Sequence, residues 1–198
     1  MVTRDDARNA QKGKERQGHP VVPGRNPLPA SNRPGAQRAK QVISAGVIVY
    51  RRTRDGIKFL ILYHGHNYWN FPKGKIENEE KSFEAALRET REETGLAASE
   101  LRVLHNFRAH ERFYYKWGGQ PFFKIVIFYL AETKNPRIKV SEEHEGYGWF
   151  TAVEGMKIMA KYRDSQRVLK QAQDFLRGNT KPRHQERSQP RRPEPPKK

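Results

Sequence analysis

The pattern of apolar and polar residues predicts a domain of mixed strands and helices in the middle of the chain. Runs of β-branched and large apolar residues, separated by polar or glycine-containing stretches, indicate strands. These runs lie at residues 42–50, 58–63, 101–115, 122–132 and 147–150. The strands and helices do not alternate strictly, so the predicted fold class is α/β or α+β, with helices packed on a mixed β-sheet.

Two segments have the spacing of helices. The first covers residues 82–94 and ends at Gly95, a residue that suits a left-handed C-terminal cap. The side of this helix that we expect to be buried carries Phe83, Leu87, Thr90 and Thr94. In residues 153–176 the apolar positions predict one or two further helices.

Composition separates this middle region from both ends of the chain. All aromatic residues (3 Trp, 8 Tyr and 10 Phe) lie between positions 41 and 177, whereas most prolines lie in residues 1–40 or 178–198. Such ends offer too little apolar surface to offset the entropy of ordering a chain. We therefore expect a folded domain at 41–177 between a disordered basic N-terminal arm, 1–40, and a disordered basic, Pro-rich C-terminal tail, 178–198.

Charge and cysteine content limit the partners of the chain. The formal net charge is +17, and basic arms attract polyanions by counterion release, so RNA or ribosome contact is one interpretation of the arms and improved solubility is the other. The absence of cysteine excludes disulfides and thiolate metal sites. No apolar stretch approaches the roughly 20 residues needed to cross a bilayer, and no signal peptide is visible. We expect a cytoplasmic protein without membrane contact.

Three glutamates on the first helix are the strongest sign of chemistry. Glu89, Glu92 and Glu93 stand at positions i, i+3 and i+4, opposite the apolar side, so their carboxylates are expected to converge. Like charges at this spacing repel one another, and a hard cation such as Mg²⁺ or Mn²⁺ would compensate them. For an acidic helix taken alone, a solvated face balanced by Arg88 and Arg91 is the alternative.

The wider spacing decides between these two interpretations. The pattern is glycine, five residues, Glu, seven residues, Arg-Glu, an aliphatic residue, any residue, Glu-Glu, any residue, glycine and an aliphatic residue. The specified positions are filled by Gly74, Glu80, Arg88, Glu89, Glu92, Glu93, Gly95 and Leu96. This segment resembles the signature of the Nudix hydrolase family. The resemblance covers about residues 42–177 and implies a Nudix-type α/β/α sandwich with a mixed β-sheet.

One position of the segment departs from the family pattern and points to a branch of it. Thr90 stands where a bulky aliphatic residue is usual, as it does in the asymmetrical diadenosine tetraphosphate hydrolases. Residues 69–74 and 141–149 also resemble that branch, although related enzymes that act on RNA 5′ ends share several of these residues. The resemblance implies hydrolysis of the phosphoanhydride chain of a nucleotide.

The resemblance also assigns roles at the expected site. It implies that Glu89, Glu92, Glu93 and the Gly74 carbonyl hold the metals, while Arg88 orients the carboxylates. Glu80 is either structural or an outer partner of the metal site. Glu143 corresponds to a glutamate proposed in that branch as metal ligand or base, and Glu142 or Glu145 could take its place.

Four residues are candidates for contact with the nucleotide substrate. Lys73 adjoins the metal loop, and Lys124 interrupts an apolar strand, so both are candidates for phosphate contacts. An outward-facing strand lysine is the alternative for Lys124. Tyr115 and Tyr147 are candidates for stacking on adenine, although such aromatics more commonly pack in a core, which we prefer for Phe113.

These observations leave three functional hypotheses. The first is asymmetrical hydrolysis of dinucleoside polyphosphates. The second is removal of pyrophosphate from RNA 5′ ends, which the basic arms motivate. The third is an RNA-binding protein with an inactive Nudix scaffold. The intact set of Arg and Glu residues argues against the third, because a scaffold needs none of those charges.

Overall fold

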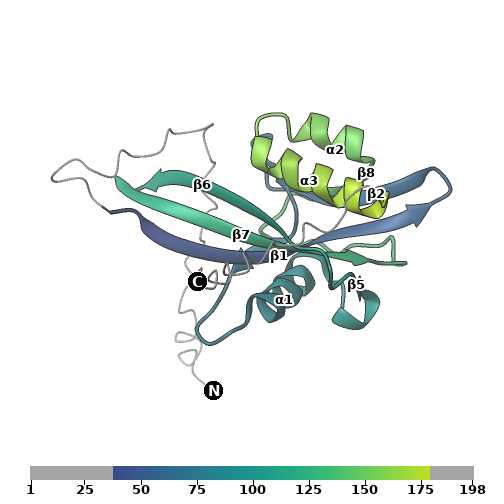
Figure 1. The fold of residues 1–198 in the computed structure, drawn as a ribbon, viewed down its shortest axis with the longest axis horizontal. Helices are drawn as coiled ribbons and strands as arrows, with labels where there is room; N and C mark the ends of the chain where they lie inside the picture. The colour runs from purple at the N-terminus through teal and green to yellow at the C-terminus, as the bar shows by residue number, and fades with distance from the viewer. Residues whose placement is uncertain (1–37, 179–198) are drawn as a thin grey trace, which may run out of the picture.

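The computed structural model describes residues 38–178, which form a mixed sheet with helices on both faces (Figure 1). The strands are β1 (Lys40–Thr53), β2 (Gly56–Tyr63), β3 (Trp69–Asn70), β4 (Lys73–Lys75), β5 (Arg102–Val103), β6 (Ala109–Trp117), β7 (Gln120–Glu132) and β8 (Gly146–Phe150). The helices are α1 (Ser82–Thr94), α2 (Ala152–Ile158) and α3 (Arg163–Leu176), and a 3-10 turn spans Ala98–Glu100. The predicted fold class is confirmed, while the two expected arms lie almost wholly outside the described residues.

Strand β1 organises the sheet. It pairs in parallel with β7 along most of its length, from Lys40 opposite Phe122 to Tyr50 opposite Glu132. On its other edge β1 pairs with β4 near its beginning and with β2 near its end, both antiparallel. β2 and β4 therefore share this edge of β1, and β4 leads directly into the loop before α1. Within residues 38–178, no helix is long and apolar enough to span a membrane.

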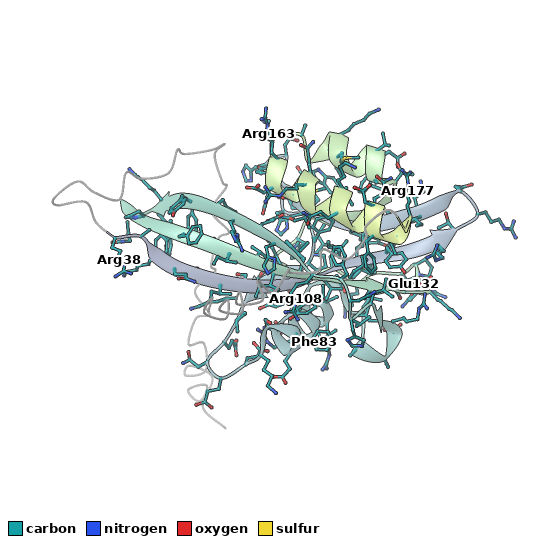
Figure 2. All side chains as sticks on the ribbon, viewed as in Figure 1. Arg38, Phe83, Arg108, Glu132, Arg163 and Arg177 are labelled. Atoms are coloured by element: carbon teal, nitrogen blue, oxygen red, sulfur yellow. The ribbon has the colours of Figure 1, made fainter. Side chains whose placement is uncertain are left out.

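Alternate residues of the strands serve two cores on opposite faces of the sheet. Ile48 and Phe128 belong to the core under α2 and α3, together with Leu169 of α3. Val47 and Leu60 belong to the core under α1. In Figure 2 Phe83 of α1 lies on one side of the sheet, and the labelled arginines at the two ends of α3 lie on the other.

The prediction of one strand over residues 101–115 is wrong. The structure has two strands there, β5 and β6, and both pair antiparallel with β7. Between them the amide of Phe107 donates to the carbonyl of Leu104, closing a turn. Leu104 and Phe107 are themselves apolar and pack in the α2–α3 core, so the hydrophobic pattern runs through the turn without a break.

The buried side of helix α1 overlaps only in part with the one we expected, since Thr90 and Thr94 are buried as predicted. Ala85 and Ala86 are fully buried against the sheet, whereas Phe83 and Leu87 are only partly buried. The buried side is therefore turned toward the glutamates, and Glu93 is buried with only 4% of its surface exposed. The two alanines permit this because their small side chains let the helix backbone approach the sheet.

The end of α1 follows the expectation more closely. Thr90 is fully buried, and its hydroxyl donates to the carbonyl of Ala86 at 2.7 Å, so the buried hydroxyl is satisfied within the helix. Gly95 caps the helix with φ 73°, the left-handed conformation predicted for it.

Enlarging Ala86 should disturb this contact between α1 and the sheet. Ala86→Leu is expected to destabilise the protein by about 1–3 kcal/mol, because the added side chain has to displace the helix or the strands below it. Urea denaturation measures the change in the free energy of unfolding. Arg91→Leu on the exposed side of the same helix is the matched control and should change it by less than about 0.5 kcal/mol. Equal effects of the two changes would show that the helix is loosely packed.

Three strands project past the helices at one end of the sheet (Figure 1). We call this part the distal ribbon; it comprises residues 40–43 of β1, 112–117 of β6 and 120–125 of β7. Arg38 marks its end in Figure 2, far from Glu132 at the other end of β7. One face of the distal ribbon continues into the site described next.

Candidate active site

The centre of the expected site is a buried pair of residues from β4 and α1. Lys73 and Glu93 are each only 4% exposed, and the Lys73 amide donates to Glu93 Oε2 at 2.9 Å. Burial raises the pKa of the Glu93 carboxyl to about 8; Lys73 opposes this shift, while Glu89 and Glu143 add to it. Ionised Glu93 is therefore held at a cost that a nearby cation would relieve.

Glu89 lies directly against the glycine of the loop that precedes α1. A Cβ on Gly74 would overlap the Glu89 carboxylate, so only glycine allows the loop and the carboxylate to meet. Arg88 holds this carboxylate in place: its Nη1 donates to Glu89 Oε1 at 2.8 Å, and its Nε and Nη2 donate to the carboxylate of Glu80 at 2.9 Å. Nη1 also lies 3.4 Å from Glu92, whose side chain is 59% exposed.

The three glutamates of α1 form an open arrangement. Within residues 38–178 no three acidic, His or Cys side chains are gathered closely enough to make a ready-made metal cage. The expected convergence is thus partial, because Glu93 is buried below the helix, Glu89 is drawn to Arg88, and Glu92 is exposed. Carboxylate oxygens beside the Gly74 carbonyl are nevertheless the donors that hard divalent cations use, often together with water and substrate oxygens. The residues present fit such an ion.

Lys73 keeps its positive charge in spite of its burial. Burial lowers the pKa of Lys73, but Tyr68, Glu93 and Glu111 outweigh this effect and raise the pKa above its ordinary value. The ammonium also lies 5.9 Å from the centre of the Tyr68 ring, a favourable cation–π arrangement. A buried, permanently charged ammonium beside the glutamates is suited to an anionic group.

Lys124 and Glu111 extend this group of charges along the neighbouring strands. Glu111 in β6 is 1% exposed, and burial raises the pKa of its carboxyl against opposition from Ser165 and Lys73. Burial lowers the pKa of Lys124 to about 8, and the charge of Lys73 adds to that shift. Lys124 is therefore partly buried beside the site and is not the outward-facing lysine of the alternative interpretation.

Sequence analysis did not single out Glu111. Its position carried a signal, because Ala109, Glu111 and Phe113 alternate along one strand and both neighbours are apolar. Strict alternation would have placed the carboxylate on the buried face. Phe113 packs against the α2–α3 core, as we preferred.

The loop before β8 brings a fourth glutamate and a histidine to the site. Glu143 is exposed, and it lies near enough to raise the pKa of both Glu89 and Glu93. Its neighbour His144 is buried, shares a hydrogen bond of 2.9 Å with the Ser141 hydroxyl, and has Nε2 3.8 Å from Glu93 Oε1. Burial lowers the pKa of His144 to about 4, so the ring is neutral at pH 7.

The other two loop glutamates differ in their surroundings. Glu145 packs against the backbone of Gly65, where an added Cβ would overlap its carboxylate. Glu142 is exposed. The charge of Glu143 acts on the carboxylates of α1, which favours it over both alternatives as the loop residue of the site.

The two candidate stacking residues lie on different faces of the sheet. Tyr115 is stacked on Phe122, with ring centres 5.1 Å apart and planes 13° apart, on the same face as Lys124. Tyr147 in β8 is 39% exposed and pairs with Leu62, which belongs to the core under α1. The structure therefore offers two separate aromatic positions, and the two rings cannot hold the same base between them.

Comparison with known proteins adds independent findings. The NUDIX domain model matches residues 40–171. The chain is 36% identical over 143 residues to the asymmetrical bis(5′-nucleosyl)-tetraphosphatase of Mus musculus, covering 67% of this chain and 94% of that protein. It is 32% identical over 140 residues to the protein of the same name from Caenorhabditis elegans, covering 69% of this chain and 98% of that protein.

Solved structures agree with these relationships. A crystal structure of a C. elegans Ap4A hydrolase binary complex superposes with a TM-score of 0.60 at 32% identity, covering 69% of this chain and 98% of that chain. The MutT protein from Methanosarcina mazei Go1 has the same fold, with a TM-score of 0.54 at 20% identity. The family match extends over most of the chain and includes the glycine loop and the glutamate helix described above. The chain therefore belongs to the Nudix family of hydrolases.

Proposed function

We propose that the protein hydrolyses dinucleoside polyphosphates asymmetrically, cutting a chain such as that of diadenosine tetraphosphate into a nucleoside triphosphate and a nucleoside monophosphate. The observation that carries this proposal is the identity of 32–36% to asymmetrical tetraphosphatases over 94–98% of their length. The site adds chemical support. Two lysines beside a set of carboxylates are suited to a polyphosphate that arrives with metal ions.

The residues divide the work of hydrolysis as follows. Glu89, Glu92 and Glu93, with the Gly74 carbonyl, hold divalent cations, for which we propose Mg²⁺ or Mn²⁺. Such ions would stabilise the charge that develops on the phosphate oxygens. Arg88 keeps the carboxylates oriented by its contacts with Glu89 and Glu80.

Phosphate binding and proton transfer fall to other side chains. Lys73 and Lys124 bind non-bridging oxygens of the polyphosphate, and Tyr115 and Tyr147 offer stacking positions for the bases. Glu143 accepts the proton of the water that attacks phosphorus, since it is exposed and lies near the α1 carboxylates. The bond between phosphorus and the bridging oxygen breaks as the new P–O bond forms, and the leaving phosphate carries the electron pair.

Product analysis tests this proposal. The full-length protein is incubated with diadenosine tetraphosphate, with ATP or with 5′-triphosphorylated RNA, in Mg²⁺, in Mn²⁺ or in a chelator, and products are separated by ion-exchange chromatography. We expect ATP and AMP in equal amounts from the first substrate and no turnover with chelator. Release of two ADP molecules, or faster turnover of the RNA, would overturn the assignment, and the second result would favour action on RNA 5′ ends.

Lys124 should give the reaction an alkaline limit. Its pKa is lowered to about 8, so the ammonium loses its proton, and its attraction for phosphate, as the pH rises through that value. We expect kcat/KM for diadenosine tetraphosphate to fall over this range. Lys124→Met should lower kcat/KM about ten- to hundredfold at pH 7, the worth of one hydrogen bond to a charged group, and should remove that limit.

Rates measured from pH 6 to 10 at fixed metal concentration test this expectation. The matched control is Lys116→Met, which removes an exposed lysine from the preceding strand of the same hairpin and should leave the profile unchanged. If kcat/KM of Lys124→Met falls with rising pH as it does in the parent, the fall is caused by another group.

A further inference from the structure

The distal ribbon has a second face that the proposed reaction does not use. On β6 this face carries every second residue from His110 to Lys116, and on β7 it carries Phe123, which pairs with Tyr114; Arg108 directly precedes β6. Glu111, Lys124 and Tyr115 have the opposite parity and lie on the active-site face. We call the second face the basic aromatic face. It comprises Ile43, Arg108, Arg112, Tyr114, Lys116 and Phe123.

The apolar part of the basic aromatic face lies beyond the helix that covers this side of the sheet. The core under α1 includes Ala45 of β1 and Ile127 of β7, but neither of the next residues toward the ribbon end on the same face, Ile43 and Ile125. Ile43 is 40% exposed. Tyr114 and Phe123 are partly exposed and lie with ring centres 4.6 Å apart and planes 30° apart. This is a pair of aromatic rings presented on an open strand surface.

The charges on the distal ribbon are of one sign. Residues 40–43, 112–117 and 120–125 contain four basic side chains and no acidic one. Arg112 and Lys116 on β6 and Arg108 directly before it are all exposed, and within residues 38–178 strand β6 pairs with β7 alone and so forms an edge of the sheet. The acidic loop at residues 77–80 follows β4, which pairs with the edge of β1 opposite β7, so β1 and β7 stand between β4 and β6 in the sheet.

We propose that the basic aromatic face binds a single-stranded nucleic acid. The phosphates follow the basic side chains of β6, and bases stack on Tyr114 and Phe123. A single strand fits better than a duplex, because paired bases are stacked inside the helix and cannot reach aromatic rings on a sheet. The surface is separate from the phosphate-binding lysines, so this binding does not depend on which nucleotide the enzyme hydrolyses.

Fluorescence anisotropy with the full-length protein tests the proposal. The probe is a labelled 12-nucleotide oligouridylate with a 5′-hydroxyl, which has no phosphoanhydride bond and so is no substrate. We expect Tyr114→Ala/Phe123→Ala to weaken binding about tenfold or more through lost stacking. Arg112→Glu/Lys116→Glu should also weaken it and should flatten the dependence of log Kd on log salt concentration. The corresponding deoxyribonucleotide strand should respond to both variants in the same direction.

Controls keep the result specific to this face. Lys157→Glu/Lys161→Glu makes the same change of charge at exposed positions in and after α2 and should change Kd less than about twofold. Each variant should keep the circular dichroism spectrum of the parent and its kcat on diadenosine tetraphosphate. A 12-base-pair duplex should not distinguish Tyr114→Ala/Phe123→Ala from the parent.

Three results would overturn the proposal. The first is unchanged oligouridylate affinity in both ribbon variants. The second is equal weakening in the α2 control, which would reduce the effect to net charge. The third is a parent protein that sediments as a dimer and ribbon variants that sediment as monomers with an unchanged Kd for oligouridylate. This result would make the basic aromatic face a contact between two copies of the chain. If the proposed hydrolysis fails, only the kcat control is lost, and the measurements of affinity, circular dichroism and sedimentation still decide this proposal.

Discussion

Replacing Glu93 by glutamine should lower kcat by about a hundredfold or more while making the metal-free protein more stable. Catalysis falls because a neutral amide cannot supply the charge that holds a cation against the phosphates. Stability rises because Glu93 is buried and its carboxyl is costly to ionise, as its raised pKa of about 8 shows.

The stability gained by Glu93→Gln should depend on pH. The unfolded chain releases the Glu93 proton near the ordinary pKa of 4.5, and the folded chain releases it near 8, so the folded state binds more protons between these values. The contribution of Glu93 to the free energy of unfolding therefore falls as the pH rises through that window. Glu93→Gln lacks this loss, so its advantage in thermal stability should be larger at pH 8 than at pH 5.

Thermal unfolding with and without Mg²⁺, together with steady-state rates, measures both effects. Added Mg²⁺ should raise the Tm of the parent and leave that of Glu93→Gln nearly unchanged, since a ligand stabilises only the state that binds it. Glu79→Gln, an exposed change in the preceding loop, is the control and should alter neither quantity. Turnover near the parent value in Glu93→Gln at saturating Mg²⁺ would refute a metal-binding role for Glu93.

Gly74→Ala should be almost as damaging to the reaction as the loss of a carboxylate. Its Cβ would occupy the place of the Glu89 carboxylate, so this carboxylate has to leave its position beside the loop. We expect kcat to fall about a hundredfold, because an error of about 1 Å in a catalytic group costs that much. The free energy of unfolding should change much less, because the end of the Glu89 side chain can move aside without displacing the backbone.

The matched control for this change is Gly146→Ala, where an added Cβ meets nothing within 4 Å. Rates and urea denaturation of both variants separate the steric effect from the general effect of removing a glycine. A fully active Gly74→Ala would mean that Glu89 can leave the loop without consequence, and its assignment as a metal ligand would then lose its structural support.

The main elements of the fold were readable from the sequence. The strands β1, β2 and β7 consist of β-branched and large apolar residues, and α1 has both the glutamate spacing and the Gly95 cap. The extra length of β1 was not readable. Its first residues, Lys40 and Gln41, are polar and exposed in the distal ribbon, where pairing with β7 fixes the strand without burying its side chains.

The structure brings the expected site residues near one another, but it buries them to degrees that the sequence did not indicate. The sequence indicated which glutamates share a region of α1. The large apolar residues Phe83 and Leu87, however, led us to expect the buried side of the helix too far from Glu93. Ala85 and Ala86 have little hydrophobic surface and so contribute little to such a pattern, although they make the close contact with the sheet. The burial of Glu93 and its contact with Lys73 depend on that approach, which only tertiary structure defines.

The parallel pairing of β1 with β7 also determines when the site can form. Val42 faces Lys124 across this ladder, and the whole segment that carries β4 and α1 lies in the chain between the two strands. Bringing β1 and β7 together closes a long loop, which costs conformational entropy before the contacts between the strands can stabilise it. Such non-local pairing is slow. During synthesis β1 leaves the ribosome well before its partner exists. We therefore expect the glycine loop and the glutamate helix to reach their final positions only after β7 has paired with β1, which makes assembly of the catalytic centre a late event in folding.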